Sequence, residues 1–144
     1  MVWQKGVVYG SIYIIGKQVF NVNMKEKKTL VIGASENKSR YSNLAVNKLR
    51  AYQHPVYALG KKEGMIADVE IITEMKPFEG IDTVTLYLSP ANQLPYYDYI
   101  LSLNPKRIIF NPGTENDELA EKAAKKGIKT LEACTLVMLS TAQY

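Results

Sequence analysis

The stretch TLVIGAS, residues 29–35, decides the expected fold. It begins with a short apolar run, and Gly33 follows that run at once. A strand of this kind has both faces covered, which is typical of the centre of a parallel sheet. A glycine directly after the strand permits the tight turn that leads the chain into a helix. The sequence therefore predicts a buried strand, a turn and a helix at this point.

Strands and helices alternate along the rest of the chain. Further strands are expected at residues 56–59, 69–72, 83–88, 107–110 and 129–132, and helices at residues 42–52, 91–103, 117–126 and 135–141. Strands that alternate with helices of this length form βαβ units, which build a parallel sheet with helices on both faces. We therefore expect an α/β protein with a Rossmann-like, three-layer, doubly wound and mostly parallel sheet of five to six strands.

Length and composition narrow the class of protein. The chain has 144 residues, of which 47% are hydrophobic, and it contains a single cysteine, Cys134. This excludes a disordered chain and a disulfide scaffold, and the lone cysteine fits a reducing cytoplasm. Its apolar runs fall far short of the ~20 residues that a membrane helix needs. The net charge of +4 favours a small phosphate-bearing ligand over nucleic acid.

Residues 1–23 differ from the rest of the chain. They carry no acid, and glycines interrupt their β-branched and aromatic residues. The dipeptides Gly10-Ser11 and Gly16-Lys17 have the form of hairpin turns, which predicts a β meander of residues 7–9, 12–15 and 18–22. A targeting segment and a natural start at Met24 remain the two alternatives. We expect the functional domain to span residues 24–144.

In an open α/β sheet the ligand crevice lies at the carboxyl ends of the strands, where the strand order reverses. The loop from Gly33 to Ser42 follows the first buried strand, and it can hold phosphate at a helix N-terminus with Lys38 and Arg40 nearby. The segments that follow the other strands complete the expected site. Its candidate residues are Gly33, Ala34, Ser35, Lys38, Arg40, Ser42, Leu59, Lys61, Lys62, Ser89, Pro90 and Asn111.

The choice of nucleotide depends on two further features. The dinucleotide fingerprint G-x-G-x-x-G is missing, because Gly33 is the only glycine between Gly16 and Gly60. The second strand is followed by Lys61-Lys62, where an NAD site would have an acidic residue for the ribose hydroxyl. Two lysines there suit an additional phosphate on the ribose. NADP and coenzyme A both carry one, and the missing glycines count against NADP.

The run from Leu30 to Ser35, with Arg40 and Ser42, resembles the opening of the small stand-alone CoA-binding proteins. Residues 110–116 and 132–139 resemble a subgroup of the same family, which is similar to the CoA-binding domain of the succinyl-CoA synthetase alpha subunit. The resemblance implies that the ligand is coenzyme A. It further implies a diphosphate at Ser35, Arg40 and Ser42, adenosine near residues 59–62, and a pantetheine arm that passes Ser89-Pro90 towards Asn111 and Cys134.

The sequence favours binding over catalysis. A ligase of this lineage needs a phosphorylated histidine outside the CoA-binding domain, and His54 is expected in a turn on the opposite side of the sheet. One histidine and one cysteine cannot build a metal site or a catalytic triad. We therefore expect a cytoplasmic CoA-binding or acyl-CoA-binding protein without catalysis and without nucleic-acid or membrane partners. An NADP-binding oxidoreductase-like domain, a CoA-binding subunit of a separately encoded acyl-CoA ligase, and a homodimer remain open.

Overall fold

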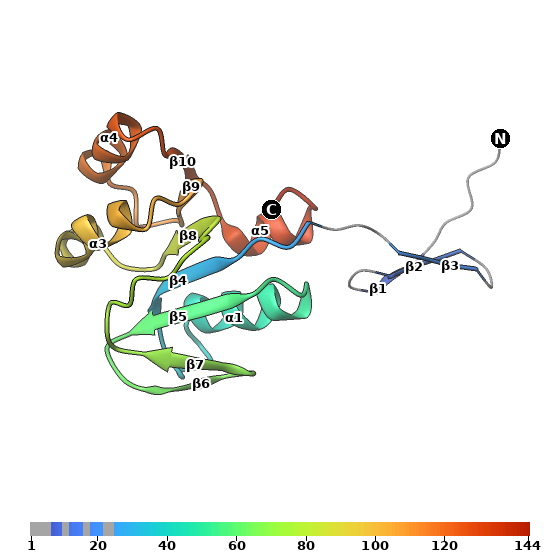
Figure 1. The fold of residues 1–144 in the computed structure, drawn as a ribbon. Helices are drawn as coiled ribbons and strands as arrows, with labels where there is room; N and C mark the ends of the chain where they lie inside the picture. The colour runs from blue at the N-terminus through green and yellow to red at the C-terminus, as the bar shows by residue number, and fades with distance from the viewer. Residues whose placement is uncertain (1–6, 10–11, 16–17, 22–24) are drawn as a thin grey trace.

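The computed structural model describes residues 7–9, 12–15, 18–21 and 25–144, and Figure 1 shows its elements. The strands of the main sheet are β4 (Thr29–Ala34), β5 (Val56–Gly60), β6 (Gly64–Ile66), β7 (Val69–Ile72), β8 (Thr83–Leu86), β9 (Arg107–Phe110) and β10 (Lys129–Glu132). The helices are α1 (Tyr41–Ala51), α2 (Pro90–Gln93), the 3-10 helix η1 (Leu94–Tyr96), α3 (Tyr97–Ser102), α4 (Asp117–Lys125) and α5 (Thr135–Ser140).

The main sheet has the strand order β10-β9-β8-β4-β5-β7-β6, and all of its neighbours are parallel except β6 and β7. From β4 the chain first adds β5 and β7 on one side and later adds β8, β9 and β10 on the other. The strand order therefore reverses between β4 and β8. The expected α/β, Rossmann-like and mostly parallel sheet is confirmed.

Helices cover both faces of this sheet and form two cores. On one face, Ile100 of α3 and Leu119 of α4 pack in a cluster with the buried side chain of Phe110 from β9. On the other face, Val46 and Leu49 of α1 pack with Leu139 of α5 against β4, β5 and β7. Leu30 and Ile32 of β4 belong to the first cluster. Val31 and Ala34 belong to the second, which explains why these four positions are apolar.

Two elements differ from expectation. Within the described residues the main sheet has seven strands where we expected five to six, because residues 64–66 form the additional antiparallel strand β6. Ala67 adopts the left-handed conformation in the turn of that hairpin (φ 53°). The usual Asn-Gly or Asp-Gly pair is absent at this turn, so the sequence carries no hairpin signal there. The helix expected at residues 91–103 is divided into α2, η1 and α3, since Pro95 lacks the N–H of a continuous helix.

The first 23 residues contain the expected antiparallel meander. It consists of β1 (Val7–Tyr9), β2 (Ile12–Ile15) and β3 (Gln18–Asn21), paired in the order β1-β2-β3. The predicted turns at Gly10-Ser11 and Gly16-Lys17 lie outside the described residues. The division into a leader and a domain that begins at Met24 stays a prediction.

Candidate functional site

A cavity of about 560 Å³ lies at the carboxyl ends of β4, β5 and β8. Its position matches the reversal of strand order between β4 and β8, where ligands bind in open α/β sheets. The segments that follow these three strands are far apart in the sequence and meet at the cavity. The cavity is lined by Gly33, Ala34, Ser35, Glu36, Arg40, Lys61, Lys62, Glu63, Tyr87, Leu88, Ser89 and Asn92.

Gly33 lies at the carboxyl end of β4 and lines the cavity. The β4–β5 register shifts between Ile32 and Ala34, so Gly33 lies in a bulge, and its φ of +96° is left-handed. A Cβ at this position would lie 2.9 Å from the carbonyl oxygen of Tyr87. Glycine is therefore required both by the backbone conformation and by the close approach of the chain after β8.

The N-terminus of α1 opens beside this loop. Arg40 is its N-cap residue, no side chain caps the first turn, and no acid lies in that turn. Ser35 holds the loop in place, because its carbonyl oxygen accepts a hydrogen bond from Asn43 Nδ2 at 2.9 Å. The hydroxyl of Ser42 is buried and has no hydrogen-bond partner among the described residues. The helix dipole and the uncapped first turn of α1 suit an anion.

The cavity wall carries more bases than acids. Arg40, Lys61 and Lys62 are exposed on it, together with Glu36 and Glu63. In the described part of the chain none of the three bases makes an ion pair with an acidic side chain, so their charges are available to a ligand. An unpaired cluster of this sign favours phosphate groups.

The structure brings together seven of the thirteen expected site residues. Those that line the cavity are Gly33, Ala34, Ser35, Arg40, Lys61, Lys62 and Ser89. The other six do not line it: Lys38, Ser42, Leu59, Pro90, Asn111 and Cys134. Buried packing explains two of the six, because Leu59 belongs to the core and Asn111 donates to Thr85 Oγ1 at 2.7 Å and accepts from Thr135 N at 2.9 Å.

Five lining residues were missing from the expected site: Glu36, Glu63, Tyr87, Leu88 and Asn92. Tyr87 and Leu88 had been assigned to the fourth strand, but β8 ends at Leu86, which places both at the cavity. The hydroxyl of Tyr87 is buried without a partner among the described residues, and burial raises its pKa. Asn92 lies one helical turn after Ser89 and donates to its hydroxyl at 3.0 Å, a spacing that the sequence does show.

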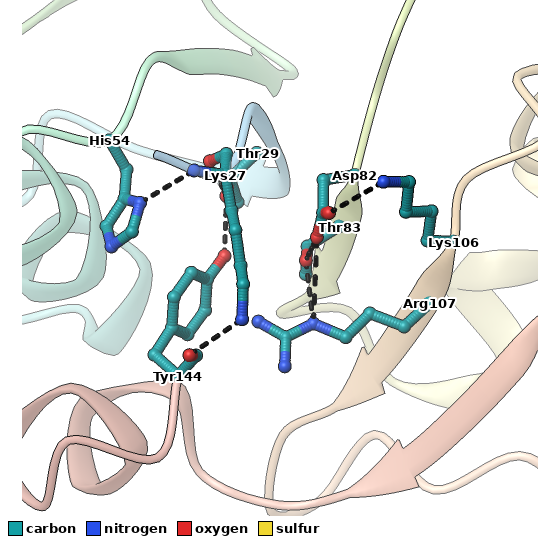
Figure 2. Close-up of polar contacts among 8 residues, drawn as sticks. All are labelled: Lys27, Thr29, His54, Asp82, Thr83, Lys106, Arg107 and Tyr144. Atoms are coloured by element: carbon teal, nitrogen blue, oxygen red, sulfur yellow. Dashed lines mark hydrogen bonds and ion pairs between the residues drawn. The ribbon is translucent and has the colours of Figure 1, made fainter. Parts of the chain in front are cut away.

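The chain's only histidine, His54, lies at the amino ends of the strands, opposite the cavity (Figure 2). His54 is buried, and its Nδ1 accepts a hydrogen bond from Lys27 N at 3.0 Å. Burial, followed by the charges of Lys27 and Arg107, lowers the pKa of His54. The predicted position of His54 away from the ligand crevice is confirmed, and its contacts are structural.

Two other kinds of site receive no support from the described residues. No described group of three His, Cys, Asp or Glu side chains could hold a metal ion. In the same part of the chain, no helix combines the length and the apolar character needed to cross a bilayer.

One comparison with known proteins identifies the family. The model of a CoA binding domain family matches residues 27–140. A crystal structure of an uncharacterised protein is 49% identical, with a TM-score of 0.82, and the match covers 84% of this chain and 100% of that chain. No curated protein matches the chain.

More distant structures share the fold. A hypothetical protein from Pyrococcus horikoshii OT3 is 21% identical over 81% of this chain and 84% of its own, with a TM-score of 0.74. The dinucleotide forming acetyl-coenzyme A synthetase 1 from Ca. Korarchaeum cryptofilum, solved with phosphate and ADP, is 18% identical, with a TM-score of 0.61. That match covers 74% of this chain and 25% of the synthetase. Because the family model covers most of the sequence, this chain belongs to the CoA-binding domain family.

Proposed function

We propose that this protein binds coenzyme A, or an acyl-CoA, in the cavity between β4, β5 and β8. The observation that carries the proposal is the meeting of Arg40 with the uncapped N-terminus of α1 on one cavity wall. The diphosphate binds there, between the loop at Ser35 and the first turn of the helix. Ser42 lies in the first turn of this helix but does not line the cavity, so its buried hydroxyl is not assigned to the ligand.

The remaining parts of the ligand follow the other two walls. Lys61 and Lys62 bind the phosphate on the ribose, which leaves the adenosine beside the end of β5. The pantetheine arm passes Tyr87 and Ser89 at the end of β8. These assignments rest on the cavity lining and on the family to which the chain belongs.

The proposed role is binding without catalysis, in a reducing cytoplasm. Neither His54 nor Cys134 lines the cavity, and this supports a site without a cysteine nucleophile or a histidine base. A CoA thiol and a free cysteine both stay reduced in that compartment. Two further hypotheses are that the protein forms a homodimer and that it acts as the CoA-binding subunit of a separate ligase. The mass of the complex purified from the native cell tests the first, and the proteins that co-purify with it test the second.

Calorimetric titration of the full chain with CoA tests the proposal. We expect Arg40→Ala to weaken CoA binding about tenfold or more, because it removes a charged hydrogen-bond donor to phosphate. Lys38→Ala is the matched control: it removes the same charge from the same loop, but Lys38 does not line the cavity. We expect its affinity to stay within about twofold of wild type, since it loses only screened long-range attraction.

Three results would overturn the proposal. The first is the absence of CoA binding by the wild-type protein. The second is an equal loss of affinity in Arg40→Ala and Lys38→Ala, because the loss would then come from the change in net charge and not from a contact with the ligand. The third is tighter binding of NADP than of CoA, which would favour the oxidoreductase-like alternative.

A further inference from the structure

Glu36 is one of two acids, with Glu63, on the wall of a cavity whose three bases suit phosphate, so its place there needs a physical reason. It follows Ser35 in the loop after β4, and its Oε2 accepts a hydrogen bond from Met65 N at 3.2 Å. Met65 belongs to β6, beyond the segment 61–63 that forms the neighbouring wall. The Glu36 carboxylate therefore joins two walls of the cavity.

Gly64 gives a second and independent sign of this contact. Its backbone lies outside the left-handed region, so the conformation alone does not demand glycine. A Cβ at Gly64 would instead lie 2.3 Å from Cδ and 2.5 Å from Cγ of Glu36. The absence of a side chain at Gly64 makes the room that the Glu36 side chain occupies.

The segment between Gly60 and Gly64 is thereby held at both ends. At Gly60, a Cβ would lie 2.3 Å from the carbonyl oxygen of Ala34, so the end of β5 packs tightly on the end of β4. At Met65 the Glu36 carboxylate holds the other end. Lys61 and Lys62 lie between these two fixed points and face the cavity.

We propose that Glu36 is a positioning residue that fixes Lys61 and Lys62 for the ribose phosphate and so sets the selectivity of the site. The inference rests on the proposed function. Glu36 acts through the peptide N–H of Met65 and does not touch the ligand. Its negative charge is not required, because an amide oxygen accepts the same hydrogen bond. The ligands selected are nucleotides that carry a phosphate on the ribose, over those that lack it.

The test compares CoA with dephospho-CoA, which lacks only the ribose phosphate, by calorimetric titration of the full chain. We expect Glu36→Ala to lower the ratio of the two affinities by about fivefold, the size of one partly exposed ion pair with phosphate. Its affinity for dephospho-CoA stays near the wild-type value. Glu36→Gln keeps the acceptor oxygen and retains the wild-type ratio. An unchanged ratio in Glu36→Ala, or an equal loss in Glu36→Gln, would overturn the inference.

Gly64→Ala provides a second route to the same change. The added methyl group displaces the flexible end of Glu36 without straining the backbone, so we expect a folded protein with the selectivity of Glu36→Ala. The double variant should then lose no more than either single variant, since both remove one contact. Additive losses would contradict a shared cause.

Hydrogen–deuterium exchange of the free protein tests the contact without a ligand. We expect faster exchange over residues 61–66 in Glu36→Ala than in wild type or Glu36→Gln. Equal exchange in all three proteins would refute the contact even if CoA binds. Wild-type protein that binds neither nucleotide would instead overturn the proposed function, and with it the selectivity role, while exchange would still decide whether the contact exists.

Discussion

Gly33 shows how much a single residue contributes to this site. The sequence places a glycine after the first buried strand, and that position alone predicts a turn next to the ligand crevice. The backbone bulge at Gly33 and the close approach of Tyr87 depend on the tertiary structure, because the segments that pack against Gly33 are far from it in the sequence. The residue type was therefore predictable, whereas the reason for its small size was not.

We expect Gly33→Ala to lower the free energy of unfolding by about 3 kcal/mol, since a left-handed alanine is strained and its Cβ meets the carbonyl oxygen of Tyr87. Gly113→Ala is the matched control. Gly113 also has a positive φ, of +90°, but a Cβ there meets nothing within 4 Å. This control should lose only about 1 kcal/mol. Urea denaturation measures both values, and equal losses would contradict the steric part of the explanation.

At the scale of elements, the sequence predicted whether a segment is a helix or a strand better than it predicted where a helix is interrupted. The expected helix 117–126 agrees with α4 because its apolar spacing is regular and Gly127 stops it. The helix expected at 91–103 was wrong as a single element, because Pro95 interrupts it. Strand β6 was missed because three residues are too few for a pattern, and only pairing with β7 defines it.

Asn116 joins α4 to the α2–α3 segment beside the cavity. Its Oδ1 accepts from Leu119 N at 3.2 Å and so caps α4. Its Nδ2 donates to Gln93 Oε1 at 2.9 Å and to Tyr97 Oη at 2.7 Å. Gln93 in turn donates to the carbonyl oxygen of Leu88, which lines the cavity, at 2.8 Å.

We expect Asn116→Ala to lower the free energy of unfolding by about 3 kcal/mol, because it removes the cap and leaves buried polar partners unsatisfied. Asn116→Ser retains an oxygen that can cap the helix but loses the two donated bonds. Its loss should be about 1 kcal/mol smaller, which is the usual value of a cap. Thermal and urea unfolding report the difference, and identical losses would assign the whole effect to the donated bonds.

At the scale of the molecule, Tyr144 links the last helix to the amino edge of the sheet (Figure 2). Its ring lies 4.9 Å from that of His54 and 4.5 Å from the guanidinium carbon of Arg107. Its carbonyl oxygen accepts from Lys27 Nζ at 2.8 Å, and its hydroxyl shares a hydrogen bond with Thr29. Residues from the two ends of the described domain therefore meet at the edge opposite the cavity.

We expect Tyr144→Ala to lower the free energy of unfolding by about 3 kcal/mol, as for a large aromatic side chain removed from a packed site. Tyr144→Phe loses only the hydroxyl and should cost about 1 kcal/mol. Tyr41→Ala is the control, because Tyr41 is 71% exposed, and its cost should stay within about 0.5 kcal/mol. The folded Tyr144→Ala protein should bind CoA with wild-type affinity, and weaker binding measured by titration would contradict the separation of the two edges.

The sequence by itself determined the fold class and the side of the sheet on which the cavity lies. Local apolar runs, helical spacing and glycine positions are short-range properties, and the carboxyl-edge rule then selects the crevice. Only the tertiary structure decided which side chains reach the cavity. It excluded Leu59 and Asn111, which pack inside. It added Glu36, which lines the cavity and contacts Met65 of a distant strand. Such contacts depend on strand pairing between distant segments, which no local pattern encodes.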